Sequence, residues 1–110
     1  MSTRTALLFG SLLFVWAGVS LAEVDADAAQ ALMKKSNCGK CHALDKKKDG
    51  PAYKETAKKN QGKADAEQKL YIHLTTNPKV KVEGKEEEHA NLKTKKEAEV
   101  RNVVRWILSR

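Results

Sequence analysis

The segment Cys38-Gly39-Lys40-Cys41-His42 constrains this chain of 110 residues more than any other feature of its sequence. Two thiols separated by two residues, with a histidine directly after the second, form the C-x-x-C-H pattern of covalent haem attachment. At this spacing the thiols can form thioethers with the two vinyl groups of one porphyrin. The next residue then lies beneath the ring, where an imidazole can bind the iron. The motif therefore predicts one haem c held through Cys38 and Cys41, with His42 as an iron ligand.

Three other uses of the two cysteines remain open at this stage. A thioredoxin-like redox pair belongs in a strand-rich α/β domain, and no strand pattern is visible here. A disulfide is possible in an exported protein, and a Zn²⁺ site could use both thiols and two of the three histidines. We favour haem because the motif accompanies an export signal and a helical domain with a small apolar core.

The first 22 residues are typical of an export signal. A basic residue stands near the start, residues 6–19 form an uncharged apolar run, and Ser20 and Ala22 place small residues at a cleavage site. The alternative is an uncleaved anchor, but a spanning helix needs about 20 apolar residues. We expect residues 1–22 to be removed, leaving residues 23–110 as one exported domain without stable membrane insertion.

Helical patterns account for most of the remaining chain, and its predicted fold class is all-α. Caps and apolar periodicity indicate four helices. The first helix starts at Asp25 or Asp27 and ends near Ser36, and the second runs from about Tyr53 to Lys59. The third extends from Asp65 to Asn77. The fourth opens at a capping box, Thr94-Lys95-Lys96-Glu97. The polar region 79–91 is expected to be irregular.

The charge of the domain favours acidic protein partners. Without Arg4, the exported part keeps 20 Lys and Arg against 14 Asp and Glu, a net charge of +6. Acidic residues are interspersed and no long basic run occurs, so nothing indicates nucleic acid. A domain of this length buries a limited core and often needs a cofactor for stability. No arrangement of nucleophile, base and oxyanion donors is legible, so we expect no enzyme.

With these features together, the chain resembles the class I c-type cytochromes, especially the small bacterial ones. The resemblance covers residues 23–110 and rests on the helix leading into the C-x-x-C-H motif, on Gly50-Pro51-Ala52-Tyr53, and on the terminal helix with Val103-Val104-Arg105-Trp106-Ile107-Leu108-Ser109. It implies a small fold of about four helices around one covalently bound haem. It also implies a periplasmic, bacterial electron carrier.

The resemblance implies roles for several further residues. The carbonyl of Pro51 should accept a hydrogen bond from Nδ1 of His42, which leaves Nε2 for the iron. Tyr53 and Trp106 should belong to the haem-binding residues. The first and last helices should pack across each other near the haem edge, which brings together Leu32, Met33, Val103, Trp106 and Ile107.

The sixth iron ligand is where this sequence departs from the family. The usual member supplies a methionine from the loop before the last helix, and that loop contains none here. Met33 lies on the apolar face of the first helix, where methionine is normally a core residue. His89 stands 17 residues before Trp106, within about one residue of where the family methionine would fall. We therefore predict a bis-histidine iron held by His42 and His89.

Two alternatives to His89 remain open. His73 shares an apolar helix face with Leu70 and Leu74, where a histidine is usually structural, and the family pattern puts this position away from the iron. The other alternative is a five-coordinate iron, which would make the protein a haem sensor or enzyme with a labile distal ligand.

Ligation by two imidazoles indicates a mono-haem electron carrier whose reduction potential is lower than that of relatives with a histidine and a methionine ligand. A second imidazole donates more electron density than a thioether and favours Fe(III). We expect a monomer that docks transiently with acidic redox partners. The lysines that would form this docking surface lie near the motif or flank the ligand loop: Lys34, Lys35, Lys40, Lys46, Lys47, Lys48, Lys79, Lys81, Lys85, Lys93, Lys95 and Lys96.

Overall fold

The computed structural model describes residues 10–15 and 23–110. The predicted signal peptide therefore lies outside the described residues except for residues 10–15, which are exposed and form no helix or strand. Within the described ranges, no helix is long and apolar enough to cross a membrane.

Helix α1 (Ala26–Lys35) leads directly into the cysteine motif. It begins at Asp25, whose carboxylate accepts a hydrogen bond from the N–H of Ala28 at 3.0 Å. This is an ordinary N-cap, which satisfies a backbone donor that the helix leaves unpaired. Asn37 then adopts a left-handed conformation (φ 58°) and turns the chain into the 3₁₀ helix η1 (Cys38–Lys40). The predicted start and end of this helix are confirmed.

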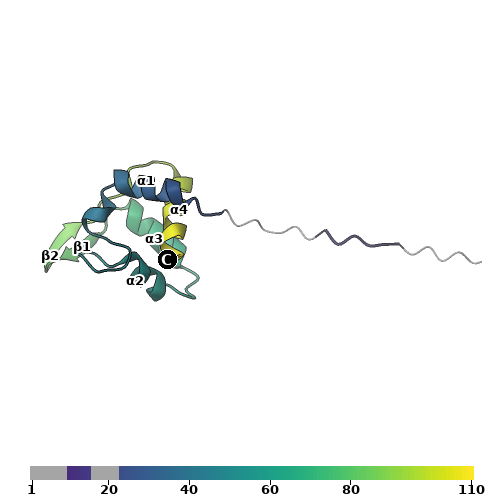
Figure 1. Ribbon diagram of the computed structural model, residues 1–110, viewed down its shortest axis with the longest axis horizontal. Helices are drawn as coiled ribbons and strands as arrows, with labels where there is room; N and C mark the ends of the chain where they lie inside the picture. The colour runs from purple at the N-terminus through teal and green to yellow at the C-terminus, as the bar shows by residue number, and fades with distance from the viewer. Residues whose placement is uncertain (1–9, 16–22) are drawn as a thin grey trace, which may run out of the picture.

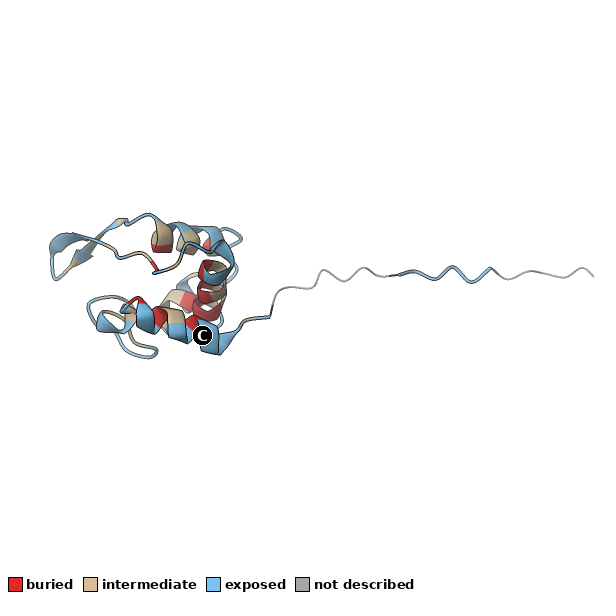
Figure 2. Ribbon diagram, turned by 90° about the horizontal axis from the view of Figure 1, so that it is seen from above, coloured by how far each residue is buried: buried red, intermediate tan, exposed pale blue. Residues whose placement is uncertain are grey.

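Helices α2 (Tyr53–Lys59) and α3 (Ala66–Thr75) follow, both in the predicted regions. Helix α4 (Glu97–Leu108) packs against α1, α2 and α3 (Figure 1). Figure 2 shows the buried positions concentrated on α4 and on the helices next to it. Met33, Val103, Trp106 and Ile107 belong to one buried cluster with Leu32 packed against it, as predicted.

The predicted capping box of the last helix is wrong. Helix α4 starts at Glu97, because Lys96 is still extended (φ −89°, ψ 113°). The hydroxyl of Thr94 accepts a hydrogen bond from the N–H of Lys96 at 3.1 Å and donates to Glu99. Glu97, the expected partner in the box, instead pairs with Arg101 at 2.8 Å. An ionic partner one helical turn away therefore replaces the predicted reciprocal cap.

The region 79–91 is not irregular as predicted, because most of it forms a β-hairpin. Strands β1 (Lys79–Val82) and β2 (Lys85–Glu88) pair antiparallel, with Lys79 opposite Glu88. The connecting residues Glu83 and Gly84 both have positive φ (50° and 79°), which matches the two-residue turn that suits the twist of a hairpin. The hairpin is an addition to the helical domain, and the predicted fold class of four helices is confirmed (Figure 1).

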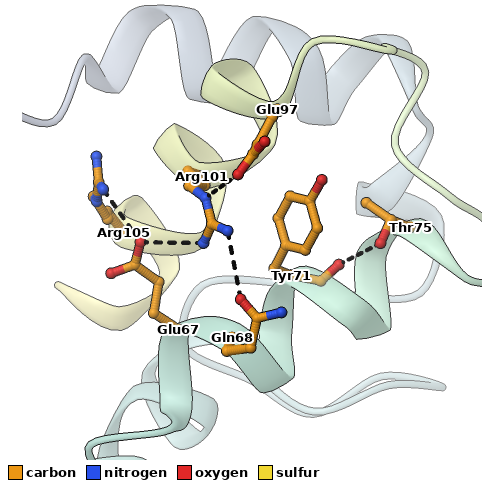
Figure 3. Close-up of polar contacts among 7 residues, drawn as sticks. All are labelled: Glu67, Gln68, Tyr71, Thr75, Glu97, Arg101 and Arg105. Atoms are coloured by element: carbon orange, nitrogen blue, oxygen red, sulfur yellow. Dashed lines mark hydrogen bonds and ion pairs between the residues drawn. The ribbon is translucent and has the colours of Figure 1, made fainter.

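A polar network on Arg101 joins α3 to α4 (Figure 3). The guanidinium donates to Glu97 at 2.8 Å and to Gln68 at 3.4 Å, and lies 3.7 Å from a carboxylate oxygen of Glu67. It also covers the ring of Tyr71, 4.5 Å from the ring centroid. Because α3 carries His73 one turn further along, this network helps to place that histidine.

Candidate functional site

A cavity of about 520 Å³ opens between the cysteine motif and the hairpin, with α4 at its base. This volume lies within the range of small-molecule and cofactor sites. The lining is mainly apolar and includes side chains from every helix: Met33, Cys38, Cys41, His42, Tyr53, Leu70, His73, Leu74, Val80, Val82, His89, Leu92, Val103 and Ile107.

The turn at η1 places both cysteines and the following histidine on one wall of this cavity. The N–H groups of Cys41 and His42 both donate to the carbonyl oxygen of Cys38, at 3.2 Å and 3.0 Å. The two half-buried thiols are not joined to each other in the described chain. Burial raises the pKa of the Cys38 thiol, and the neighbouring Cys41 raises it further. The motif thus presents two thiols and one imidazole to the same space.

His42 is held on three sides. Its Nδ1–H donates to the carbonyl oxygen of Pro51 at 2.8 Å, which confirms the predicted hydrogen bond. The ring of Tyr53 stacks on the imidazole with the centroids 5.4 Å apart. Gly50 lies against the third side, where even a Cβ would collide with the imidazole. With Nδ1 used by Pro51, Nε2 is the nitrogen that remains to bind a metal.

His89 lies across the cavity from the motif, at the end of β2. Its ring centroid is 6.1 Å from that of His42 and 4.3 Å from that of His73. Burial lowers the pKa of His89, and the nearby His42 lowers it further. The ring is therefore favoured in its neutral form, which is the form that binds metals.

His73 lines the same cavity, and its place away from the iron stays a prediction. Burial lowers its pKa, and the neighbouring imidazoles of His89 and His42 add to this effect. The structure brings all three histidines of the chain together at one site.

The residues present fit a covalently attached haem. Among the described residues, two buried polar atoms have no hydrogen-bond partner, Nδ1 of His89 and Nε1 of Trp106. Buried polar atoms are normally paired, and His89 lines the cavity, so its unpaired nitrogen suits a metal-containing group bound there. When bound, haem supplies an iron that changes between Fe(II) and Fe(III). Cys38, Cys41 and His42 would hold it on one side.

Tyr53 and Trp106 form a second layer beside the motif. Tyr53 lines the cavity, and burial raises the pKa of its hydroxyl above the ordinary range. Trp106 meets Tyr53 edge-on at 5.6 Å and is not among the described residues that line the cavity. Direct contact of Trp106 with the cofactor therefore stays a prediction.

Two groups of residues at this site are not among those predicted from the sequence. Val80 and Val82 of the hairpin line the cavity, and the alternating Lys-Val-Lys-Val followed by a Glu83-Gly84 turn is a signal that could have revealed them. Asn77 donates to the carbonyl oxygen of His89, and Asn91, in the loop that carries His89, accepts from the N–H of Asn77. Nothing in the sequence indicates that two asparagines 14 residues apart meet.

Comparisons with known proteins agree with this geometry. The chain matches the Cytochrome c family over residues 26–110. It is 37% identical to cytochrome c-551 of Stutzerimonas stutzeri over 84 residues, which covers 76% of this chain and 78% of that protein. It is 47% identical to cytochrome c-551 of Pseudomonas aeruginosa over 45 residues, 41% of this chain and 43% of that protein.

Solved structures show the same relationship. The class 1 cytochrome MtoD from Sideroxydans lithotrophicus ES-1 superposes with a TM-score of 0.75 at 52% identity, over 79% of this chain and 97% of that one. Wild-type cytochrome c552 of Nitrosomonas europaea superposes with a TM-score of 0.57 at 28% identity, over 73% and 96%. The thioredoxin-like, disulfide and zinc alternatives are therefore replaced by covalent haem. The chain belongs to the cytochrome c family, as an electron carrier and not an enzyme, with its haem attached through Cys38 and Cys41.

Proposed function

We propose that this cytochrome is a mono-haem carrier whose iron is bound by two imidazoles, those of His42 and His89. The observation that carries this proposal is their position on facing walls of one apolar cavity, with ring centroids 6.1 Å apart. His42 is fixed by Pro51, and a buried ring nitrogen of His89 has no partner among the described residues.

His89 is a better distal ligand than His73. The ring contact that His42 makes across the cavity is with His89 at 6.1 Å, whereas the ring contact of His73 is with His89 at 4.3 Å. His89 also belongs to the loop before the last helix, which is where the family supplies its second ligand.

Two imidazoles lower the reduction potential relative to relatives with a methionine ligand and similar haem burial. Imidazole is the stronger donor and stabilises Fe(III). Axial ligands set haem potentials over a range of about 0.8 V, so this single exchange is large enough to change which donors and acceptors can be used. With both axial positions filled, substrate chemistry at the iron is not expected.

Electron paramagnetic resonance of the oxidised protein tests the ligand assignment. We expect a low-spin bis-imidazole spectrum that His89→Ala converts to high-spin, while His73→Ala leaves it low-spin. His73→Ala is the matched control because it removes an imidazole from the same cavity. A low-spin spectrum retained by His89→Ala would exclude His89 as the ligand.

We further propose that the protein is exported to the bacterial periplasm and functions there as a monomer. The N-terminal pattern supports cleavage after Ala22, and the two c-551 relatives are bacterial. The mass of the purified holoprotein should correspond to residues 23–110 plus one haem. A mass that retains residues 1–22 would contradict cleavage.

Lysines near the motif support docking of acidic redox partners. Lys40, Lys46 and Lys47 are exposed on the segment that carries the cysteines and on the loop after it. Opposite charges increase encounter rates and keep complexes short-lived, and salt weakens this effect. Electron-transfer rates with a small acidic redox protein should fall as salt rises, and more for wild type than for Lys47→Glu. Lys58→Glu on α2 is the control with the same change in charge, and equal effects of both substitutions would reject docking at the motif.

A further inference from the structure

We propose that Asn77 and Asn91 are positioning residues that hold the backbone of His89 and so slow the release of this distal ligand from the iron. The inference rests on the proposed ligation by His89. It concerns a part of the molecule that no feature of the sequence singled out, the junction between the end of α3 and the ligand loop.

Both backbone polar groups of His89 are bonded to the segment after α3. Its N–H donates to the carbonyl oxygen of Pro78 at 2.8 Å. Its carbonyl oxygen accepts from the side-chain amide of Asn77 at 3.0 Å. A residue paired on both sides cannot shift without breaking at least one of these bonds.

Asn91 fixes Asn77 in the conformation that makes this contact. Its Oδ1 accepts from the backbone N–H of Asn77 at 2.8 Å, and its Nδ2 donates to Oδ1 of Asn77 at 2.9 Å and to the carbonyl oxygen of Thr75 at 3.1 Å. Asn77 has a left-handed backbone (φ 47°), which asparagine tolerates better than most residues. The two asparagines therefore close a reciprocal link between the end of α3 and the ligand loop.

This link matters for the iron because His89 lies at the end of a hairpin strand and not on a helix. Strand β2 is exposed along its whole length and belongs to a two-stranded sheet, which makes the hairpin a weak support by itself. On the other side of His89, Leu92 is buried and its N–H donates to the carbonyl oxygen of Leu74 at 3.0 Å. Together with the bond to Pro78, the asparagine pair attaches His89 to the end of α3, so ligand release should require the pair to open.

Carbon monoxide binding to the reduced holoprotein measures this release. At high carbon monoxide concentration the binding rate is limited by departure of the distal ligand. Loss of the three hydrogen bonds of Asn91 in Asn91→Ala should raise this limiting rate about tenfold or more. Asn77→Gly, which retains the left-handed backbone but removes the bond to His89, should also raise it.

Asn102→Ala is the matched control. Asn102 also makes reciprocal bonds to one backbone segment: its Oδ1 accepts from the N–H of Asp25 at 2.9 Å and its Nδ2 donates to the Asp25 carbonyl at 2.8 Å. These bonds join α4 to the start of α1 and do not involve the haem cavity. Asn102→Ala should lower the free energy of unfolding and leave the limiting rate unchanged.

The outcomes separate this inference from the ligand assignment. If His89→Ala becomes high-spin but both Asn91→Ala and Asn77→Gly bind carbon monoxide at the wild-type rate, the positioning role is wrong and the ligand assignment stands. An equal acceleration in Asn102→Ala would likewise reject it, because general destabilisation would then explain the rate. If His89→Ala stays low-spin, the ligand assignment fails and this inference fails with it.

Discussion

Gly50 lies directly against the imidazole of His42. A Cβ added to Gly50 would meet the ring, 2.7 Å from Nδ1 and 2.9 Å from Nε2. Neither distance is compatible with an undistorted contact, and the ring could not retreat without losing the 2.8 Å hydrogen bond to Pro51. Gly50 therefore helps to fix the His42 ring and is not only a turn residue.

Substituting Gly50 by alanine should displace the His42 ring and weaken its hydrogen bond to Pro51. We expect a loss of about 1–3 kcal/mol in the free energy of unfolding of the holoprotein, as for other overpacked sites, together with an altered reduction potential. Chemical denaturation and redox titration measure the two effects. Gly39→Ala is the control, because a Cβ at Gly39 meets nothing within 4 Å. Equal effects of the two substitutions would contradict this role.

Substitutions of Val103 and Val104 distinguish the effect of packing around the haem from the effect of packing in the rest of the core. Both side chains are almost completely buried, with 1% and 0% of their surface exposed. Val103 lines the cavity, and Val104 does not. Either Val→Ala substitution should cost about 2 kcal/mol of stability. Only Val103→Ala should also shift the haem absorption bands or the potential, so an equal spectral shift in Val104→Ala would contradict the assignment.

Arg101 should contribute more to stability than an ordinary surface cation. It combines an ion pair with Glu97, contacts to Gln68 and Glu67 on α3, and the face of Tyr71. Arg101→Ala should therefore lower the free energy of unfolding by at least about twice as much as the removal of a single exposed ion pair does. Arg101→Lys should recover only part of the loss because lysine lacks the planar fork.

Lys59 provides the comparison for Arg101. It makes one exposed pair with Glu55 at 3.2 Å within α2. Thermal unfolding of Arg101→Ala, Arg101→Lys and Lys59→Ala should show the largest decrease in Tm for the first. If Lys59→Ala lowers Tm as much, the network adds nothing beyond single pairs.

The hairpin turn should be improved by asparagine at position 83. Glu83 has positive φ, which disfavours glutamate, and asparagine before glycine is the preferred pair in such a turn. Glu83→Asn should stabilise the hairpin by about 0.5–1 kcal/mol, and Gly84→Ala should destabilise it by about 1 kcal/mol. Amide hydrogen exchange of β1 and β2 reports this local change. Faster exchange in Glu83→Asn would show that the turn has another geometry.

Local chemistry explains which elements could be predicted from the sequence. The start of α1 at Asp25 depends on a side chain and a backbone group three residues apart, and α2 also occupies its predicted bounds. The hairpin was missed because only two of its eight strand residues are apolar, and its pairing depends on a turn that places two residues at positive φ. The capping box failed because Glu97 found an ionic partner, Arg101, further along the helix.

The sequence alone determined the covalent chemistry of this protein, because Cys38, Cys41 and His42 act through spacings of a few residues that any chain with this motif shares. Only the tertiary structure decided the surroundings of His89. His73 and His89 are 16 residues apart, and their 4.3 Å ring contact exists because α3 packs on α4 and the asparagine pair returns the loop to the end of α3. Contacts between distant segments depend on packing and hydrogen bonds that form only when the chain folds, so local sequence patterns do not predict them.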